Sequence, residues 1–126
     1  MRVFKNKWFN RWARGEDVSD SVLFKAAEEI LSGKVEADLG GYLFKKRLAQ
    51  AGRGKRGGYR TIVGYRKPNS ERIIFLYAFG KSEKANISER EEAALSLVAE
   101  AFIFATEKQV NELLSEGSIW EVKDNE

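Results

Sequence analysis

The side chains best suited to chemistry are basic ones, and many lie between Leu39 and Ser70. This window, called the basic segment below, holds nine of the chain's 22 Lys and Arg residues and none of its 19 Asp and Glu residues. A local cluster of one sign creates a local field that attracts polyanions, even though the net charge of the whole chain is only +3. We interpret the basic segment as a surface for nucleic acid. The alternative is a solvated charged loop, which would not need the aromatic residues and glycines found between these cations.

Any chemistry on a polyanion would have to use a restricted set of side chains. The chain has no histidine and no cysteine, which removes the commonest general base and two common metal ligands. No metal-ligand constellation is visible, and AGRGKRGG lacks the spacing of a nucleotide-binding P-loop, so we expect no cofactor and no metal. RNA can still be cleaved by its own 2′-hydroxyl if the protein supplies a base, an acid and positive charge.

Five cations are the candidate catalytic residues: Lys45, Arg47, Arg60, Lys81 and Lys84. Arg60 would neutralise the charge that develops on the phosphoryl oxygens. Lys45 is crowded by other cations, so its neutral form is favoured and it is the candidate base. Lys81 or Lys84 would protonate the leaving 5′-oxygen. Many RNA-binding proteins carry a basic segment and cleave nothing, so a non-catalytic RNA-binding module remains an alternative.

A second set of residues is predicted to bind RNA without reacting: Arg53, Lys55, Arg56, Tyr59 and Arg66. Arginine binds phosphate in bidentate fashion, and a tyrosine can stack on an unpaired base. We expect a glycine- and arginine-rich loop from Gly52 to Gly58, which would grip phosphates. For Tyr59 a place in the core is about as plausible as stacking, and for Tyr77 the core interpretation is preferred.

The hydrophobic pattern predicts the strands that position these cations. A period of two favours strands near residues 42–48 and 59–66, and RIIFLYAF at residues 72–79 is apolar on both faces, as in a doubly covered central strand. Short connections favour an antiparallel meander. On the first of these strands we expect Tyr42, Phe44 and Leu48 to face one way, and Leu43, Lys45 and Arg47 the other.

The helices are predicted by their caps and apolar stripes. After a short strand at residues 2–5, Trp8, Phe9 and Trp12 predict a helix that ends near Gly15, and we interpret these aromatics as core. Ser19 or Asp20 would cap a second helix that ends at Gly33. Capping boxes at residues 88–91 and 106–109 predict two more helices, followed by a possible strand at residues 119–122.

Together these elements predict an α+β fold in which two N-terminal helices pack on a small antiparallel sheet, with C-terminal helices, in a single domain over residues 1–126. No run of about 18 apolar residues is present, so a membrane span is not expected. The first residues lack an uninterrupted apolar region of the kind found in signal peptides. The absence of cysteine fits a reducing compartment, and we expect a cytoplasmic protein.

Three segments carry a family resemblance: KNKWFNRWAR, then DLGGYLFKKRLAQAGRGKRGGYRTIVGYR, then IIFLYAFGKSEKANIS. In this order and separation they resemble the RelE/ParE superfamily of toxins from bacterial type II toxin–antitoxin systems, nearest the RelE-type branch with the HigB-like toxins. The resemblance implies a compact RelE-like fold and a metal-independent endoribonuclease that cleaves mRNA on the ribosome and so inhibits translation. It also implies a cognate antitoxin, which we expect to be a helix-turn-helix protein.

The resemblance also implies positions for the site. The cations of RelE-type toxins would correspond to Lys45 and Arg47, to the arginine of GGYR, which is Arg60, and to the Lys81–Lys84 segment after the central strand. Toxins of the ParE branch inhibit gyrase instead of cutting RNA, and the fold does not separate the two activities. A gyrase-inhibiting toxin is therefore a second alternative.

Overall fold

The computed structural model describes residues 1–50, 54–66, 71–80 and 86–124, and for residues 50 and 54–57 it describes only the backbone. The elements in chain order are β1 (Arg2–Asn6), α1 (Lys7–Gly15), α2 (Asp20–Leu31), β2 (Ala37–Gly40), β3 (Leu43–Gln50), β4 (Gly54–Gly64), β5 (Arg72–Gly80), α3 (Glu89–Ile103), α4 (Glu107–Ser115) and β6 (Ile119–Val122).

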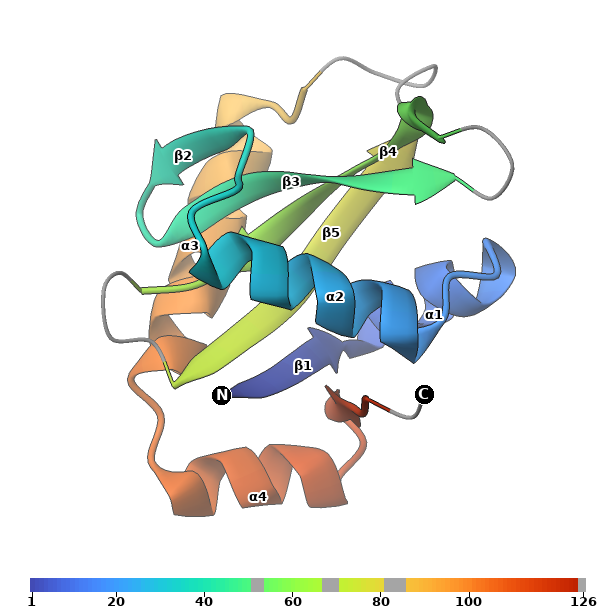
Figure 1. Ribbon diagram of the computed structural model, residues 1–126. Helices are drawn as coiled ribbons and strands as arrows, with labels where there is room; N and C mark the ends of the chain where they lie inside the picture. Colours follow the sequence, from blue (N-terminus) through green and yellow to red (C-terminus); the bar gives the residue numbers. More distant parts are fainter. Residues whose placement is uncertain (51–53, 67–70, 81–85, 125–126) are drawn as a thin grey trace.

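The strands form a sheet in the order β2-β3-β4-β5-β1-β6 (Figure 1). β3, β4 and β5 pair antiparallel in succession, which confirms the predicted meander. β1 lies beside β5 and runs parallel to it, and β6 pairs antiparallel with β1. The predicted α+β class is confirmed, and the sheet contains one strand that was not predicted, β2, which pairs antiparallel with β3 at the edge.

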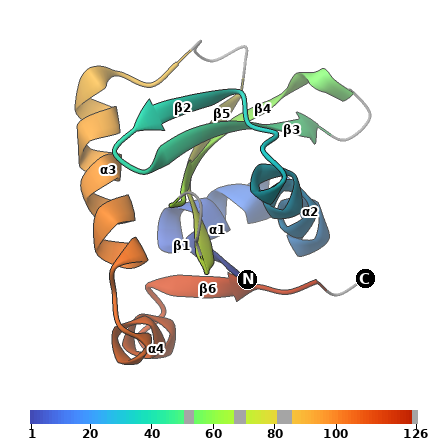
Figure 2. The same cartoon turned by 60° about the vertical axis from the view of Figure 1, so that its left-hand side comes forward.

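Helices cover both faces of the sheet (Figure 2). The face under α1 and α2, called the α2 face, buries Phe44, Val63 and Phe75 among others. The opposite face, called the α3 face, buries Leu43 and Ile62 together with side chains of α3 and α4. The alternation of buried residues along β3 and β4 therefore assigns each polar residue between them to one face or the other.

Side-chain caps begin all four helices in these ranges. Asn6 accepts a hydrogen bond from the backbone N–H of Phe9 at 2.7 Å, and Ser19 caps α2 in the same way. The predicted capping boxes are present at the starts of α3 and α4, each with both hydrogen bonds formed. Gly33 and Gly117 follow α2 and α4 with φ of +91° and +76°, a region that disfavours other residues.

Three local predictions are corrected by the structure. The segment from Gly54 to Gly58 belongs to β4 instead of a loop, because the pairing of β3 with β4 continues to Gln50 and Gly54. Tyr42 has φ of +67° and packs against Phe104 at a ring distance of 5.7 Å, so it does not share a face with Phe44. Trp8 is 41% exposed and not part of the core.

Candidate nucleic-acid interface

Three of the predicted catalytic cations lie together on the α3 face. Arg47 of β3 is the direct cross-strand partner of Arg60 of β4, and Lys45 is the partner of the buried Ile62. Directly opposed residues have Cβ atoms about 4.5–5.5 Å apart and project from the same face. The ladder between β3 and β4 thus places two guanidinium groups side by side, with Lys45 about 7 Å along the same strand.

The two arginines carry buried nitrogen atoms that lack a hydrogen-bond partner among the described residues: Nε of Arg47 and Nη1 of Arg60. Arg60 as a whole is only 8% exposed. Like charges placed directly opposite each other destabilise a sheet, and buried donors without partners are rare in folded proteins. An anion between the two guanidinium groups would relieve both penalties, and phosphate has the oxygens that arginine binds best.

Carboxylates do not neutralise this pair within the described residues. Glu36 is the neighbouring acid on the chain entering β2, and its Oε1 accepts a hydrogen bond from the backbone N–H of Arg47, not from the guanidinium. Lys45 likewise has no ion pair among the described residues. The α3 face therefore keeps a concentrated positive charge beside its apolar core.

The other strand cations whose side chains are described are held by structural partners. Lys46 projects to the α2 face, where its Nζ lies 2.7 Å from Glu29 and donates to the carbonyl of Lys34. Arg2 of β1 donates from Nε and Nη2 to the Glu121 carboxylate at 3.0 and 2.9 Å. This ion pair raises the pKa of Arg2 and lowers the pKa of Glu121. These cations stabilise the fold and are not available to a ligand.

The residues predicted only to bind RNA separate in the structure. Tyr59 is buried on the α2 face, where its hydroxyl donates to Glu16 at 2.7 Å and its ring packs on Trp12. That position does not favour stacking on a base. Arg66 lies six residues beyond Arg60, about 20 Å along the strand direction, with its guanidinium over the Phe104 ring.

The other predicted site residues cannot be placed as side chains. Lys55 and Arg56 belong to β4 by their backbone. Arg53, Lys81 and Lys84 lie outside the described residues. Gly80, which ends β5, is the register partner of Tyr59, so the chain enters the Lys81–Lys84 segment one register position from Arg60.

An aromatic row beside Arg60 was not predicted as part of a site. Phe79 of β5 is the direct cross-strand partner of Arg60, and Tyr77 lies two residues away on the same face. The Tyr77 ring lies 6.1 Å from Phe79 and 4.7 Å from the exposed Trp8 of α1. The sequence carried one signal for α1: residues 1–15 contain five Lys or Arg residues and no acid.

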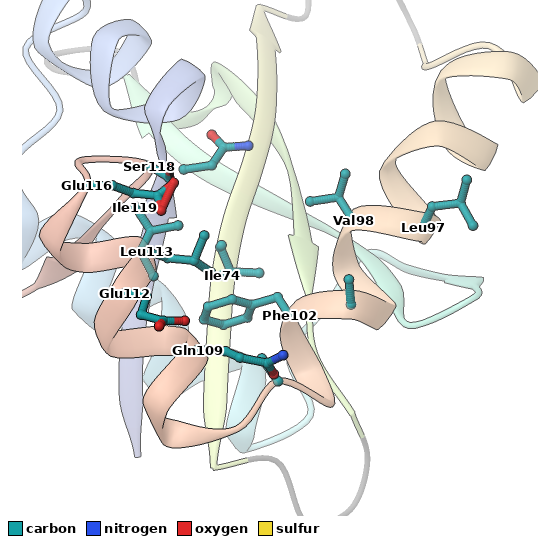
Figure 3. Close-up of a pocket in the computed structure, with 13 residues that line it drawn as sticks. Ile74, Leu97, Val98, Phe102, Gln109, Glu112, Leu113, Glu116, Ser118 and Ile119 are labelled. Carbon is teal, nitrogen blue, oxygen red and sulfur yellow. Dashed lines mark hydrogen bonds between the residues drawn. The ribbon is translucent and has the colours of Figure 1, made fainter.

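A cavity among the described residues occupies a different region of the α3 face. It has a volume of about 650 Å³ and lies between α3 and α4. Figure 3 shows Phe102 of α3 and Leu113 of α4 facing each other near Ile74 of β5. Glu112 and Glu116 are its charged residues. An apolar groove with acidic residues is unsuited to a polyanion, so it is not the candidate interface.

The structure is thus an α+β domain with a mixed sheet and a pair of opposed arginines on its α3 face. Residues 1–122 match the family described as the RelE toxin of the RelE / RelB toxin-antitoxin system, and the chain belongs to that family. It is therefore a toxin of a toxin–antitoxin system, and membership implies a cognate antitoxin partner. None of the curated proteins matches the chain significantly. Within the described ranges, no helix has the length and apolar character needed to cross a membrane.

Proposed function

We propose that this toxin is a metal-independent endoribonuclease of the HigB-like branch that cleaves mRNA on the ribosome and so inhibits translation in the cytoplasm. We treat residues 1–126 as a single toxin domain. The observation that carries the proposal is the cross-strand pair of Arg47 and Arg60, with buried nitrogens that lack partners among the described residues. Such a pair suits the phosphodiester group of RNA, whose negative charge increases during cleavage.

The chemistry assigned to these residues needs no group beyond the protein and the substrate. The 2′-oxygen of RNA forms a bond to the adjacent phosphorus while the bond from phosphorus to the 5′-oxygen breaks. Lys45 accepts the proton of the 2′-hydroxyl, and Lys81 or Lys84 donates a proton to the leaving 5′-oxygen. Arg47 and Arg60 stabilise the charge on the phosphoryl oxygens. Lys55, Arg56 and Arg53 extend phosphate binding along the RNA.

The partner proposed for this toxin is an antitoxin that contains a helix-turn-helix domain and an acidic or apolar segment. An acidic segment over Lys45, Arg47 and Arg60 would neutralise the same charges that bind RNA. Binding of that kind weakens as salt rises, because exposed charge pairs are screened. Binding that is insensitive to salt would instead place the antitoxin on an apolar surface such as the groove between α3 and α4.

The test is induction of the chain in a bacterial host without its antitoxin, followed by mapping of the 5′ ends of cellular RNA. We expect growth arrest with new cuts inside translated mRNA, and we expect Arg60→Ala to reduce cleavage by roughly 10²–10³-fold. Arg66→Ala is the matched control, because it removes an arginine of the basic segment that lies far from Arg60. Full toxicity of Arg60→Ala would show that the assigned site is wrong.

The two alternatives predict different results in the same experiment. A gyrase-inhibiting toxin would induce a DNA damage response while mRNA remains intact. A non-catalytic RNA-binding protein would bind RNA with a steep salt dependence and leave it uncut. Either result would replace the nuclease proposal.

A further inference from the structure

Trp8 is exposed in a way that packing does not explain. Its neighbours in α1 follow the predicted pattern, because Phe9 is fully buried and Trp12 packs against the same core. Trp8 instead leaves 41% of its surface exposed and lies against Tyr77, with ring centroids 4.7 Å apart and planes inclined by 36°. One side of the indole is therefore held by the protein, and a large part of its surface remains available.

We propose that Trp8 is a stacking platform for an unpaired nucleobase of the bound RNA, an inference that rests on the proposed function. An aromatic ring supported by a second ring is a pre-ordered surface for a base, and every base offers a flat face to it. Tyr77 is the support, and Phe79 continues the apolar row to the arginine pair.

The position of Trp8 relative to the arginine pair supports this role. Phe79 lies directly opposite Arg60, and Tyr77 lies two residues along β5 on the same face. From the strand spacing and the rise per residue, Trp8 is on the order of 10 Å from Arg60. A single RNA strand with a phosphate at the arginine pair can therefore place a neighbouring base on Trp8.

The basic residues of α1 also support the proposed path of the RNA strand past Trp8. Lys7, Arg11 and Arg14 are exposed on this helix, which has no acidic residue. Arg11 follows Trp8 by three residues, and residues three apart are neighbours on a helix surface. Cations beside an aromatic platform are the combination found where proteins hold single-stranded nucleic acid. A duplex would keep its bases stacked on each other, so the platform selects an unpaired strand.

The test measures binding of the purified toxin to ribosomes programmed with an mRNA whose codon nucleotides carry 2′-O-methyl groups, so that the RNA binds but cannot be cut. Trp8→Ala should weaken binding roughly 5- to 100-fold, and Trp8→Phe should restore most of the affinity. Phe104→Ala is the matched control, because Phe104 is also an exposed aromatic residue, at 52%, but lies at the end of α3. Far-ultraviolet circular dichroism confirms that the variants are folded.

A second mRNA identifies the contact as one with a base. When the codon nucleotides are abasic, Trp8→Ala and the unmodified toxin should bind equally, because the stacking partner has been removed. An equal loss on intact and abasic mRNA would overturn the proposal, as would unchanged binding of Trp8→Ala. If Trp8→Ala instead binds mRNA normally but loses affinity for the antitoxin, Trp8 is a protein-binding anchor and the proposal is overturned.

These results are distinguishable from failure of the nuclease proposal. If Arg60→Ala loses binding and Trp8→Ala does not, the nuclease proposal survives and the stacking inference does not. If neither the unmodified toxin nor any variant binds programmed ribosomes, both are overturned.

Discussion

Lys46 and Arg47 are neighbours in β3, yet they project to opposite faces of the sheet and have opposite surroundings. On the α2 face Lys46 is 2% exposed, lies 2.7 Å from the Glu29 carboxylate and donates to the Lys34 carbonyl. On the α3 face Arg47 is placed against another cation, Arg60, and the Arg47 Nε has no partner among the described residues. The charge of Lys46 is therefore compensated, whereas that of Arg47 has no compensating carboxylate among the described residues.

The difference separates cations that are paired within the fold from cations that lack a compensating group among the described residues. A buried charge is tolerated when it is paired and hydrogen-bonded, which describes Lys46. Two opposed arginines lower the stability of the sheet instead of raising it. Strain of this kind in a folded protein tends to occur at functional sites. The pairing of each cation, and not its sequence position in the basic segment, therefore indicates its role.

The largest expected effect is on the free energy of unfolding and concerns Lys46, the paired cation of the α2 face. Lys46→Met should lower the free energy of unfolding by about 3 kcal/mol, because it removes the buried ion pair with Glu29 and the hydrogen bond to the Lys34 carbonyl. Urea denaturation followed by circular dichroism measures this change. Lys34→Ala is the control, since that side chain is exposed and should alter stability by less than about 0.5 kcal/mol. A Lys46→Met variant as stable as the unmodified chain would show that the ion pair contributes nothing.

The next largest effect is a gain in stability when an anion is added, and it concerns the pair of Arg47 and Arg60. A short 2′-O-methyl RNA at a hundred times its Kd should stabilise the toxin by about 2.7 kcal/mol, because it binds only the folded state. Thermal unfolding with and without the RNA measures the gain as a rise in Tm. Arg60→Ala should remove most of this gain, whereas Arg66→Ala should keep it. An equal loss in both variants would mean that RNA binds the basic segment without using the arginine pair.

The same substitution on the neighbouring residue, Arg47, should not destabilise the fold. Arg47→Met should leave the free energy of unfolding unchanged or raise it by up to about 1 kcal/mol, because it removes the repulsion between opposed cations and keeps the length of the side chain. Urea denaturation without any anion measures this change beside that of Lys46→Met. If Arg47→Met destabilises the chain as much as Lys46→Met does, the comparison between the two faces fails.

The meander and the caps were predictable because they depend on local signals. The period of two along β3 and β4, the apolar run of β5 and the capping boxes of α3 and α4 involve residues close in sequence. The alternation along β3 also assigned Lys45 and Arg47 to one face correctly. Their convergence with Arg60 required the register of β3 with β4, which the sequence suggests but does not determine.

The remaining features depend on contacts between distant segments. β1 pairs with β5 about 70 residues away, so its place in the sheet left no local signal. Glycines at residues 54, 57 and 58 suggested a loop, yet pairing with β3 holds them in β4. Helical spacing grouped Trp8 with Phe9 and Trp12, and only the packing of α1 against β5 separates Trp8 and brings it to Tyr77.

The smallest expected effect concerns the ion pair between Arg2 of β1 and Glu121 of β6, and it depends on pH. The Arg2 guanidinium holds the pKa of Glu121 below its ordinary value of 4.5, so folding favours the ionised carboxylate. The resulting stability is fully present above pH 4.5 and is lost as pH falls through the lowered pKa. Glu121→Gln should therefore cost about 1 kcal/mol at pH 7, because the bidentate ion pair with Arg2 is partly buried.

Urea denaturation of the two chains between pH 7 and pH 3 measures how this difference depends on pH. The gap between the unmodified chain and Glu121→Gln should narrow below pH 4.5, since the protonated carboxyl and the amide have the same charge. A gap that stays constant over this range would mean that Glu121 acts through packing and not through its charge. In that case the pairing of Arg2 with Glu121 would not stabilise the fold through charge, as the pairing of Lys46 with Glu29 is expected to do.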